Sequence, residues 1–281
     1  MQSLLDVPAP AKLNLFLHIT GRRDDGYHLL QSAFMLIDWC DTLHFERLSR
    51  DHLEREDLTV PLPADDLVLR AARLLKETSG CPLGAHIAIE KRLPAEAGMG
   101  GGSSDAASTL LALNRLWDLK WPLSRLQALG LQLGADVPFF LSGQHAWVEG
   151  IGEKIQPLSL PEKSWVVLKP QAGLETARIF RDPHLERQTK TATMADFAAR
   201  PFDFGRNDLQ PVAERLCPEV TQALDWLRTL GLQPRMTGSG SAVFASLHRP
   251  LEWPPTPAGW HLRVCNNLKA HPLAGWAFSD N

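Results

Sequence analysis

A glycine-rich loop, Gly98–Gly102, constrains this chain more than any other feature, because four of its five residues are glycine. An alternating apolar run over residues 85–90 precedes the loop, and a helical pattern over residues 106–117 follows it. Glycine allows positive φ and lets the backbone approach a ligand, since no Cβ stands in the way. Ser103–Asp105 offer N-caps for the helix, whose free N–H groups and dipole favour an anion. The sequence therefore predicts a phosphate-binding loop.

Two familiar phosphate loops do not match these residues. A Walker A loop requires lysine directly after its last glycine, and a dinucleotide-binding fingerprint requires a third glycine, but Ser103 stands at both places. A flexible glycine linker is the other interpretation. Linkers rarely adjoin an amphipathic helix, however, and Ala106, Leu110, Leu113 and Trp117 fall on one helical face. The pattern thus favours a binding loop over a linker.

Charge and composition disfavour several classes of protein. The chain has 281 residues, enough for one or two domains, and its formal net charge of −3 gives no electrostatic case for a nucleic-acid partner. No apolar run reaches membrane-spanning length and the N-terminus lacks a signal-peptide pattern, so we expect a cytoplasmic protein without a membrane partner. We expect a monomer or a weak homodimer. Reduced structural thiols are expected at Cys40, Cys81, Cys217 and Cys265.

The order of predicted elements indicates an α+β protein. Alternation over residues 13–19 predicts a strand with one apolar face; its other face, starting with Lys12 and Asn14, could be covered or solvated. Residues 135–138 are expected to turn, because Pro138 cannot continue a helix. The other expected elements are strands over 29–37, 85–90, 165–168, 242–247 and 261–265, helices over 67–77, 106–117, 124–133, 208–216 and 220–230, and a hairpin of 145–149 with 154–157. A change of character near residue 160 predicts two lobes.

Three segments, in order along the chain, resemble the motifs of the GHMP small-molecule kinases. They are residues 10–15 (PAKLNL), 94–104 (PAEAGMGGGSS) and 236–242 (MTGSGSA). One short glycine motif would be weak evidence, whereas three in this order span most of the chain. The resemblance implies an α+β fold of two lobes with the active site in the cleft between them. It implies an N-terminal lobe over 1–160, with the substrate strand and the glycine-rich ATP loop, and a C-terminal lobe over 161–281.

Further segments resemble one branch of that superfamily. They are residues 9–17, 23–28 (RDDGYH), 133–140 (LGADVPFF) and 149–153 (EGIGE). The match extends from the N-terminus to about Ala245. It implies ATP-dependent phosphorylation of the C2 hydroxyl of an erythritol that carries a cytidine diphosphate group. The product would be the 2-phosphate, in the non-mevalonate route to isoprenoid precursors.

The same resemblance assigns catalytic residues. A tertiary alcohol is a poor nucleophile, so a carboxylate must take its proton as the phosphoryl group arrives. Asp136 matches that base, and Lys12 matches a cation that stabilises charge on the hydroxyl or the phosphate. From spacing alone, Asp136 would be a turn-forming aspartate and Lys12 an ordinary surface lysine.

ATP and Mg²⁺ are the implied co-substrate and metal. The resemblance has the loop hold the ATP phosphates through backbone N–H groups, over Pro94, Gly98, Met99, Gly100, Gly101, Gly102, Ser103 and Ser104. Mg²⁺ would bridge phosphate oxygens, with Ser104 as a candidate contact. Two residues depart from the pattern. Glu96 would repel phosphate unless it points to solvent, and Asp66 stands where relatives often have asparagine near the adenine.

Substrate recognition is implied by matched position. Asn14 and His28 would hydrogen-bond the substrate, with His28 at the cytosine end. Tyr27 and Phe180 would stack on the two faces of the cytosine, although core packing would explain Phe180 equally well. The third motif would contribute the contacts of Thr237, Gly238, Ser239 and Gly240.

Other functions remain open from the sequence. Another GHMP kinase, acting on homoserine or a sugar, would have no use for a cytosine clamp at Tyr27 and His28. A non-catalytic nucleotide-binding relative would be expected to lack Lys12 or Asp136, and both are present. An RNA-binding module of similar topology is disfavoured by the net charge.

Overall fold

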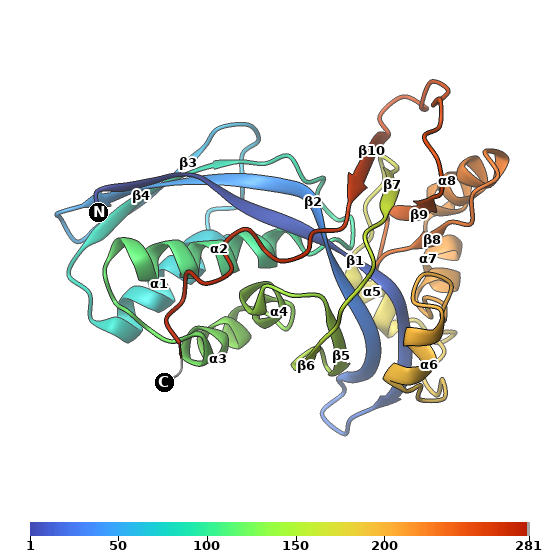
Figure 1. Ribbon diagram of the computed structural model, residues 1–281, viewed down its shortest axis with the longest axis horizontal. Coiled ribbons are helices and arrows are strands. Elements are labelled where there is room, and N and C mark those ends of the chain that lie inside the picture. The colour runs from blue at the N-terminus through green and yellow to red at the C-terminus, as the bar shows by residue number, and fades with distance from the viewer. Residues whose placement is uncertain (280–281) are drawn as a thin grey trace.

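The computed structural model describes residues 1–279, which form two β-sheets with helices packed against them (Figure 1). The larger sheet has the strand order β3-β4-β2-β5-β6, with β1 paired to β2. Its strands are β1 (Ser3–Arg22), β2 (His28–Leu48), β3 (Leu53–Asp57), β4 (Gly84–Glu90), β5 (Ala146–Gly150) and β6 (Lys154–Pro157). The smaller sheet has the order β10-β7-β9-β8. Its strands are β7 (Ser164–Lys169), β8 (Arg235–Met236), β9 (Val243–Leu247) and β10 (His261–Asn266). The α+β prediction is confirmed.

The helices divide between the two sheets. One group lies along the larger sheet (Figure 1) and consists of α1 (Leu67–Ser79), α2 (Gly101–Leu116), α3 (Leu123–Leu133) and α4 (Val137–Ser142). The other comprises α5 (Thr176–Arg181), α6 (Met194–Ala199), α7 (Gln210–Leu216) and α8 (Pro218–Thr229), of which α7 and α8 share a core with the smaller sheet. The predicted hairpin is the β5–β6 pair. The turn expected over 135–138 is confined to residues 135–136, because Pro138 is tolerated in the first turn of α4.

Strand β1 links the two parts of the molecule. It pairs with β2 along most of its length, and near its end the backbone N–H of Leu17 donates to the carbonyl of Arg206 over 2.9 Å. Lys12 and Asn14 are both buried, so the second face of this strand is covered and not solvated.

Helix α2 begins earlier than the sequence indicates. Its N-cap is Gly100, at a φ of 72°, and it continues from Gly101. Ser103, Ser104 and Asp105 are therefore inside the helix and cap nothing, so the predicted N-caps are wrong. Glycine is a poor helix former, which favours a later start. Here the tertiary packing of the buried helix overrides that propensity.

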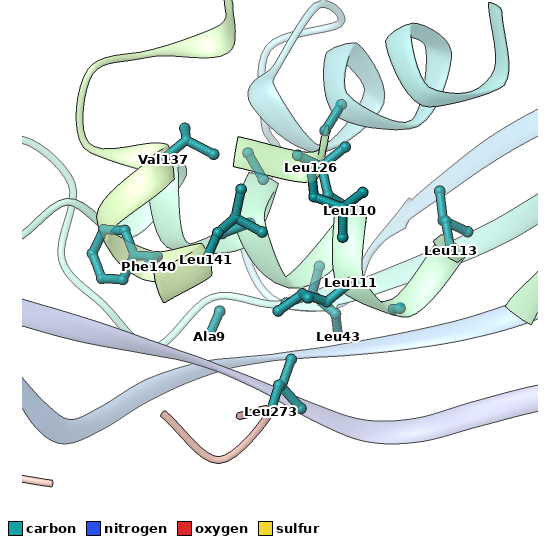
Figure 2. Packing of buried hydrophobic residues seen from close by; sticks show 14 of the residues in the cluster. Ala9, Leu43, Leu110, Leu111, Leu113, Leu126, Val137, Phe140, Leu141 and Leu273 are labelled. Carbon is teal, nitrogen blue, oxygen red and sulfur yellow. The ribbon is translucent and has the colours of Figure 1, made fainter. Parts of the chain in front are cut away.

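The main hydrophobic core lies between α2 and the larger sheet. Figure 2 shows its packing from close by. The labelled residues come from β1 (Ala9), β2 (Leu43), α2 (Leu110, Leu111, Leu113), α3 (Leu126), α4 (Val137, Phe140, Leu141) and the C-terminal segment (Leu273). Because α2 is buried on nearly every side, its predicted face of Ala106, Leu110, Leu113 and Trp117 is only part of its packing surface.

The C-terminal segment returns to the larger sheet after β10 (Figure 1). The backbone N–H groups of Leu268 and His271 donate to the carbonyls of Leu36 and Gly143, over 3.0 and 2.8 Å, and Leu273 joins the main core. The division into lobes 1–160 and 161–281 stays a prediction, and this segment packs on the first of the two.

The cysteines agree with a further expectation. All four cysteines are free, which confirms reduced thiols, and burial raises the pKa of Cys265 to about 12. In the described part of the chain, no helix combines the length and apolarity needed to cross a membrane.

Truncating the α2 core should destabilise the protein strongly. We expect Leu110→Ala to lower the free energy of unfolding by about 2–5 kcal/mol, because it removes buried contacts and leaves a cavity. Leu131→Ala, on a side chain that is 43% exposed, is the matched control and should change it by less than about 0.5 kcal/mol. Urea denaturation measures both. Equal losses in the two variants would contradict this packing.

Candidate active site

Prolines in β1 shape the strand next to the glycine loop. Pro8 and Pro10 have no N–H to donate, and the pairing of β1 with β2 shifts register between Pro10 and Lys12. The N–H of Lys12 donates to the carbonyl of Met99 over 3.0 Å, while the hydroxyl of Ser104 donates to the carbonyl of Pro10 over 2.7 Å. These two hydrogen bonds connect β1 to the loop and to α2 at residues 10–12.

The glycine loop contacts the third motif backbone to backbone. Gly98 has a φ of 69°, and a Cβ on it would lie only 2.3 Å from the carbonyl oxygen of Thr237. A Cβ on Gly238 would likewise lie 2.5 Å from the carbonyl oxygen of Gly98. The N–H of Ser241 donates to the carbonyl of Glu96 over 3.0 Å. All three segments singled out in the sequence therefore meet at one place.

Lys12 and Asp136 form the charged pair of this site. The Lys12 Nζ lies 3.6 Å from Asp136 Oδ2, and the lysine side chain is 5% exposed against 30% for the aspartate. The same Nζ donates to Asn14 Oδ1 over 2.5 Å. Burial lowers the pKa of Lys12, and the attraction of Asp136 opposes that lowering. Lys12 is therefore not an ordinary surface lysine.

Asp136 precedes α4, and its side chain does not cap that helix. An aspartate whose role is to form a turn or a cap accepts a hydrogen bond from nearby backbone N–H groups. Here the charged partner of the Asp136 carboxylate is Lys12. One side of the carboxylate is accessible, which suits a group that must exchange a proton with a substrate.

Asn14 is held on three sides. Its N–H donates to Thr237 Oγ1 over 2.9 Å, its Nδ2 donates to Ser32 Oγ over 2.9 Å, and its Oδ1 accepts from Lys12. The hydroxyl of Ser32 in turn donates to the carbonyl of Phe16. Asn14 thus orients Lys12 and keeps only one amide hydrogen for a substrate. Sequence reasoning missed Ser32, whose strand position gave no signal of a polar role.

The third motif is a turn that other residues hold in place. Asn207 Nδ2 donates to the carbonyls of Met236 and Gly238, over 2.9 and 2.8 Å. Thr237 faces Asn14, whereas the exposed hydroxyl of Ser239 pairs with that of Thr176 at 2.8 Å. Of the four residues predicted here to contact the substrate, Ser239 is the one with a partly exposed hydroxyl.

The hydroxyl of Ser104 is already engaged. The side chain is fully buried, and its hydroxyl hydrogen goes to the carbonyl of Pro10, which leaves only the lone pairs of the oxygen for a metal. The Mg²⁺ contact at Ser104 stays a prediction, and the burial of the side chain is the feature that argues against it. Ser103, one residue earlier, is partly exposed, and its Oγ lies beside Gly134, two residues before Asp136.

Glu96 and Asp66 are the two departures from the motif pattern. The carboxylate of Glu96 lies against Gly173. Asp66 caps α1 by accepting from the N–H of Leu69 over 3.0 Å and pairs with Arg55 at 2.7 Å. Asp66 therefore helps to hold the start of α1, whereas Glu96 is exposed.

A buried charge cluster lies under the entry to the loop. Lys91 Nζ contacts the carboxylate of Asp41 and lies 2.6 Å from Asp105 Oδ2. Asp41 also accepts from the N–H groups of Arg92 and Leu93. Burial raises the pKa of Asp105, and Lys91 opposes that rise. Asp105 belongs to this cluster. The only signal of the cluster in the sequence is that its charged residues lie within or next to apolar segments.

The predicted cytosine contacts lie at the start of β2 and in α5. The rings of His28 and Phe180 are 5.1 Å apart, and Arg187 Nε donates to His28 Nε2 over 3.1 Å. Burial lowers the pKa of His28, and the charges of Arg187 and Arg22 lower it further. Tyr27 is 61% exposed. Within the described chain, no aromatic contact joins it to Phe180.

Comparisons with known proteins agree with this arrangement. The family model described as "GHMP kinases N terminal domain" matches residues 66–144, and the one described as "GHMP kinases C terminal" matches residues 192–250. The 4-diphosphocytidyl-2-C-methyl-D-erythritol kinase of Albidiferax ferrireducens is 64% identical, covering 100% of this chain and 98% of its own length. The enzyme of the same name from Acidovorax sp. strain JS42 is 62% identical, covering 99% and 100%.

Two solved structures of kinases are similar to this chain. A crystal structure of 4-(cytidine 5'-diphospho)-2C-methyl-D-erythritol kinase has a TM-score of 0.76 and 39% identity, covering 88% of this chain and 91% of that one. A homoserine kinase from Cytophaga hutchinsonii has a TM-score of 0.68 at 16% identity, covering 96% of each chain. The second likeness concerns the fold alone.

Contact between the loop and the third motif can be tested at Gly98. We expect Gly98→Ala to raise KM for ATP at least tenfold, because its Cβ would displace the Thr237 backbone as well as strain a left-handed φ. Gly80→Ala is the matched control: Gly80 has a similar φ of 66°, and nothing lies within 4 Å of its Cβ position. Unchanged ATP kinetics in a folded Gly98→Ala protein would contradict this role.

The role of Ser104 is equally testable. We expect Ser104→Ala to lower the free energy of unfolding by about 0.5–1.5 kcal/mol, because it removes a buried hydrogen bond to the Pro10 carbonyl, and to leave the Mg²⁺ dependence of turnover unchanged. Denaturation and a Mg²⁺ titration measure the two effects. A raised Mg²⁺ requirement at unchanged stability would restore Ser104 as a metal contact.

Proposed function

The chain belongs to the GHMP kinases, in the branch of 4-diphosphocytidyl-2-C-methyl-D-erythritol kinases, and we propose that its Lys12–Asp136 pair carries the phosphoryl transfer. As a member of that branch it uses ATP to phosphorylate the C2 hydroxyl of 4-diphosphocytidyl-2-C-methyl-D-erythritol. The product is the 2-phosphate, a precursor in the non-mevalonate synthesis of isoprenoids.

Asp136 is the base in this proposal. Its accessible carboxylate accepts the proton of the C2 hydroxyl while the oxygen attacks the γ-phosphorus of ATP, and the bond to the β-phosphate oxygen breaks. The observation that carries the assignment is the 3.6 Å approach of Lys12 to a carboxylate that caps no helix. ADP leaves with the electron pair of the broken bond.

Lys12 supplies positive charge beside the reacting oxygen. Asn14 holds its Nζ in place, so little reorganisation is needed when negative charge gathers on the hydroxyl and the transferred group. A preorganised cation in a site shielded from water stabilises such charge more than a solvated lysine could.

The glycine loop is the proposed phosphate cradle. The N-terminus of α2 follows it directly, so unpaired backbone N–H groups of residues 98–103 and the helix dipole favour the phosphates. Mg²⁺, when bound with ATP, would neutralise phosphate charge. The described residues contain no cluster of three or more His, Cys, Asp or Glu side chains that could hold a metal, so the ion would be held mainly by ATP oxygens.

The cytidine end of the substrate would lie at the start of β2. His28 and Phe180 are in contact there, and the exposed ring of Tyr27 can cover a base from the other side. Stacking on aromatic rings accepts any base, so the choice of cytosine must come from hydrogen bonds at its edge. We further propose that the protein is a monomer or a weak homodimer and works in the cytoplasm, a location that the free cysteines support.

The base assignment predicts the effect of one isosteric change. We expect Asp136→Asn to lower kcat by about 10²–10⁴-fold, because the amide cannot accept the proton, with ATP binding retained. Coupled detection of ADP measures kcat, and calorimetric titration measures ATP affinity. Asp225→Asn, on the exposed side of α8, is the control and should keep full activity. Near wild-type turnover of Asp136→Asn would remove Asp136 from the mechanism.

A further inference from the structure

A cavity of about 340 Å³ lies at the edge of the smaller sheet. It is lined mainly by residues of β7, β8 and β9, by the turn over 201–203 and by the connection between α8 and β8. Within the described residues, none of those assigned to the phosphoryl transfer or to the cytosine contacts lines it. A cavity of this size can hold a small organic molecule.

Arg235 lines this cavity, and one edge of its guanidinium has no hydrogen-bond partner within residues 1–279. Its Nη1 donates to the carbonyls of Leu15 and Phe204, over 2.7 and 2.8 Å. These two bonds use both hydrogens of Nη1 and hold the guanidinium in one orientation, while the hydrogens of Nε and Nη2 stay available. The parallel N–H groups of that edge match the two oxygens of a carboxylate.

The charges around the cavity also favour an anion. Burial lowers the pKa of Arg235, and the negative charge of Asp203 opposes that lowering, although the two side chains form no ion pair in the described structure. A second cation lies close by, because Lys163 Nζ is 5.4 Å from the centre of the Phe202 ring, which lines the same cavity. A partly buried guanidinium is costly without a directly paired anion.

Aromatic rings form the apolar part of the cavity wall. Trp165, Phe202 and Phe244 all line it, and the Trp165 ring lies 5.1 Å from that of Phe202 and 5.7 Å from that of Phe244. Trp165 is 1% exposed, and its Nε1–H has no acceptor among the described residues. A buried donor without a partner is unfavourable. Both unpaired groups of the cavity are therefore donors, which calls for a ligand rich in acceptors.

We propose that this cavity is a second ligand site, for a small aromatic carboxylate. The carboxylate pairs with the Nε–Nη2 edge of Arg235, and the ring of the ligand packs against Phe202 and Phe244. The inference goes beyond the proposed function and does not depend on it, because no residue of the cavity takes part in the phosphoryl transfer.

Calorimetric titration of the full chain with 2-naphthoate tests the site. We expect 2-naphthoate to bind, and its neutral analogue 2-naphthamide to bind roughly 10- to 150-fold more weakly, because the amide lacks the charge and the second oxygen that the arginine edge meets. Saturating ATP should leave the affinity for 2-naphthoate unchanged. Absence of 2-naphthoate binding, equal binding of the two compounds, or displacement by ATP would overturn the proposal.

Two substitutions locate the binding. We expect Arg235→Lys to weaken binding of 2-naphthoate roughly 10- to 150-fold, because an ammonium keeps the charge but lacks the paired N–H edge. Asp203→Asn should instead tighten it several-fold, because the competing carboxylate is removed while the backbone hydrogen bonds of Arg235 stay intact. This second variant decides the matter if Arg235→Lys does not fold.

Arg263→Lys is the matched control. Arg263 is on β10 of the same sheet and lies 5.4 Å from the ring of Trp39, outside the cavity, so this variant should keep the wild-type affinity. A folded Arg235→Lys protein or an Asp203→Asn protein with wild-type affinity for 2-naphthoate would overturn the proposal, and so would an equal loss in Arg263→Lys.

Discussion

Backbone contact between two glycine-containing turns is the constraint on which the site depends. Gly98 and Gly238 approach so closely that a Cβ on either would overlap a carbonyl group of the other turn. This closeness brings the Thr237 hydroxyl to the backbone of Asn14 and lets the N–H of Ser241 meet the carbonyl of Glu96. Side chains would hold the two turns apart, and the strand with the reacting groups would lose contact with the second sheet. Glycine thus serves the contact between the loop and the third motif as much as the approach of a phosphate.

The site also depends on a chain of hydrogen bonds, with fixed donors and acceptors, that starts from the buried strand β1. Ser32 gives its only hydroxyl hydrogen to the carbonyl of Phe16, so its oxygen must accept from the amide Nδ2 of Asn14. That fixes the amide orientation and turns Oδ1 toward Lys12. A buried ammonium is costly unless it is paired and hydrogen-bonded, and here Asp136 and Asn14 supply both. Because Asp136 is also the group that would take up a proton, the partner that stabilises the buried cation changes its charge during the proposed reaction.

Sequence patterns could predict what depends on local periodicity and on a matched motif. They predicted most of the strands but neither β3 nor β8, the helix over 106–117 in outline, and Lys12 and Asp136 as residues of one site. They failed where tertiary packing decides, as at Asp105, which looked like a helix cap and instead completes a buried cluster. Arg187 was invisible for the same reason: its partner is 159 positions away, and no periodicity connects a donor with an acceptor across that distance.

The placement of these residues separates chemistry from choice of substrate. Lys12 and Asp136 are held by β1, the glycine loop and the start of α4, whose surroundings are largely buried. The residues proposed to meet the cytosine are on the turn before β2 and on the segment between β7 and α7, which are more exposed, with Tyr27 as the extreme case. Changes in that outer region would alter which base is accepted without moving the reacting pair. This separation allows the scaffold to persist while the outer segments diverge. The fold shared with a homoserine kinase at 16% identity is consistent with such divergence.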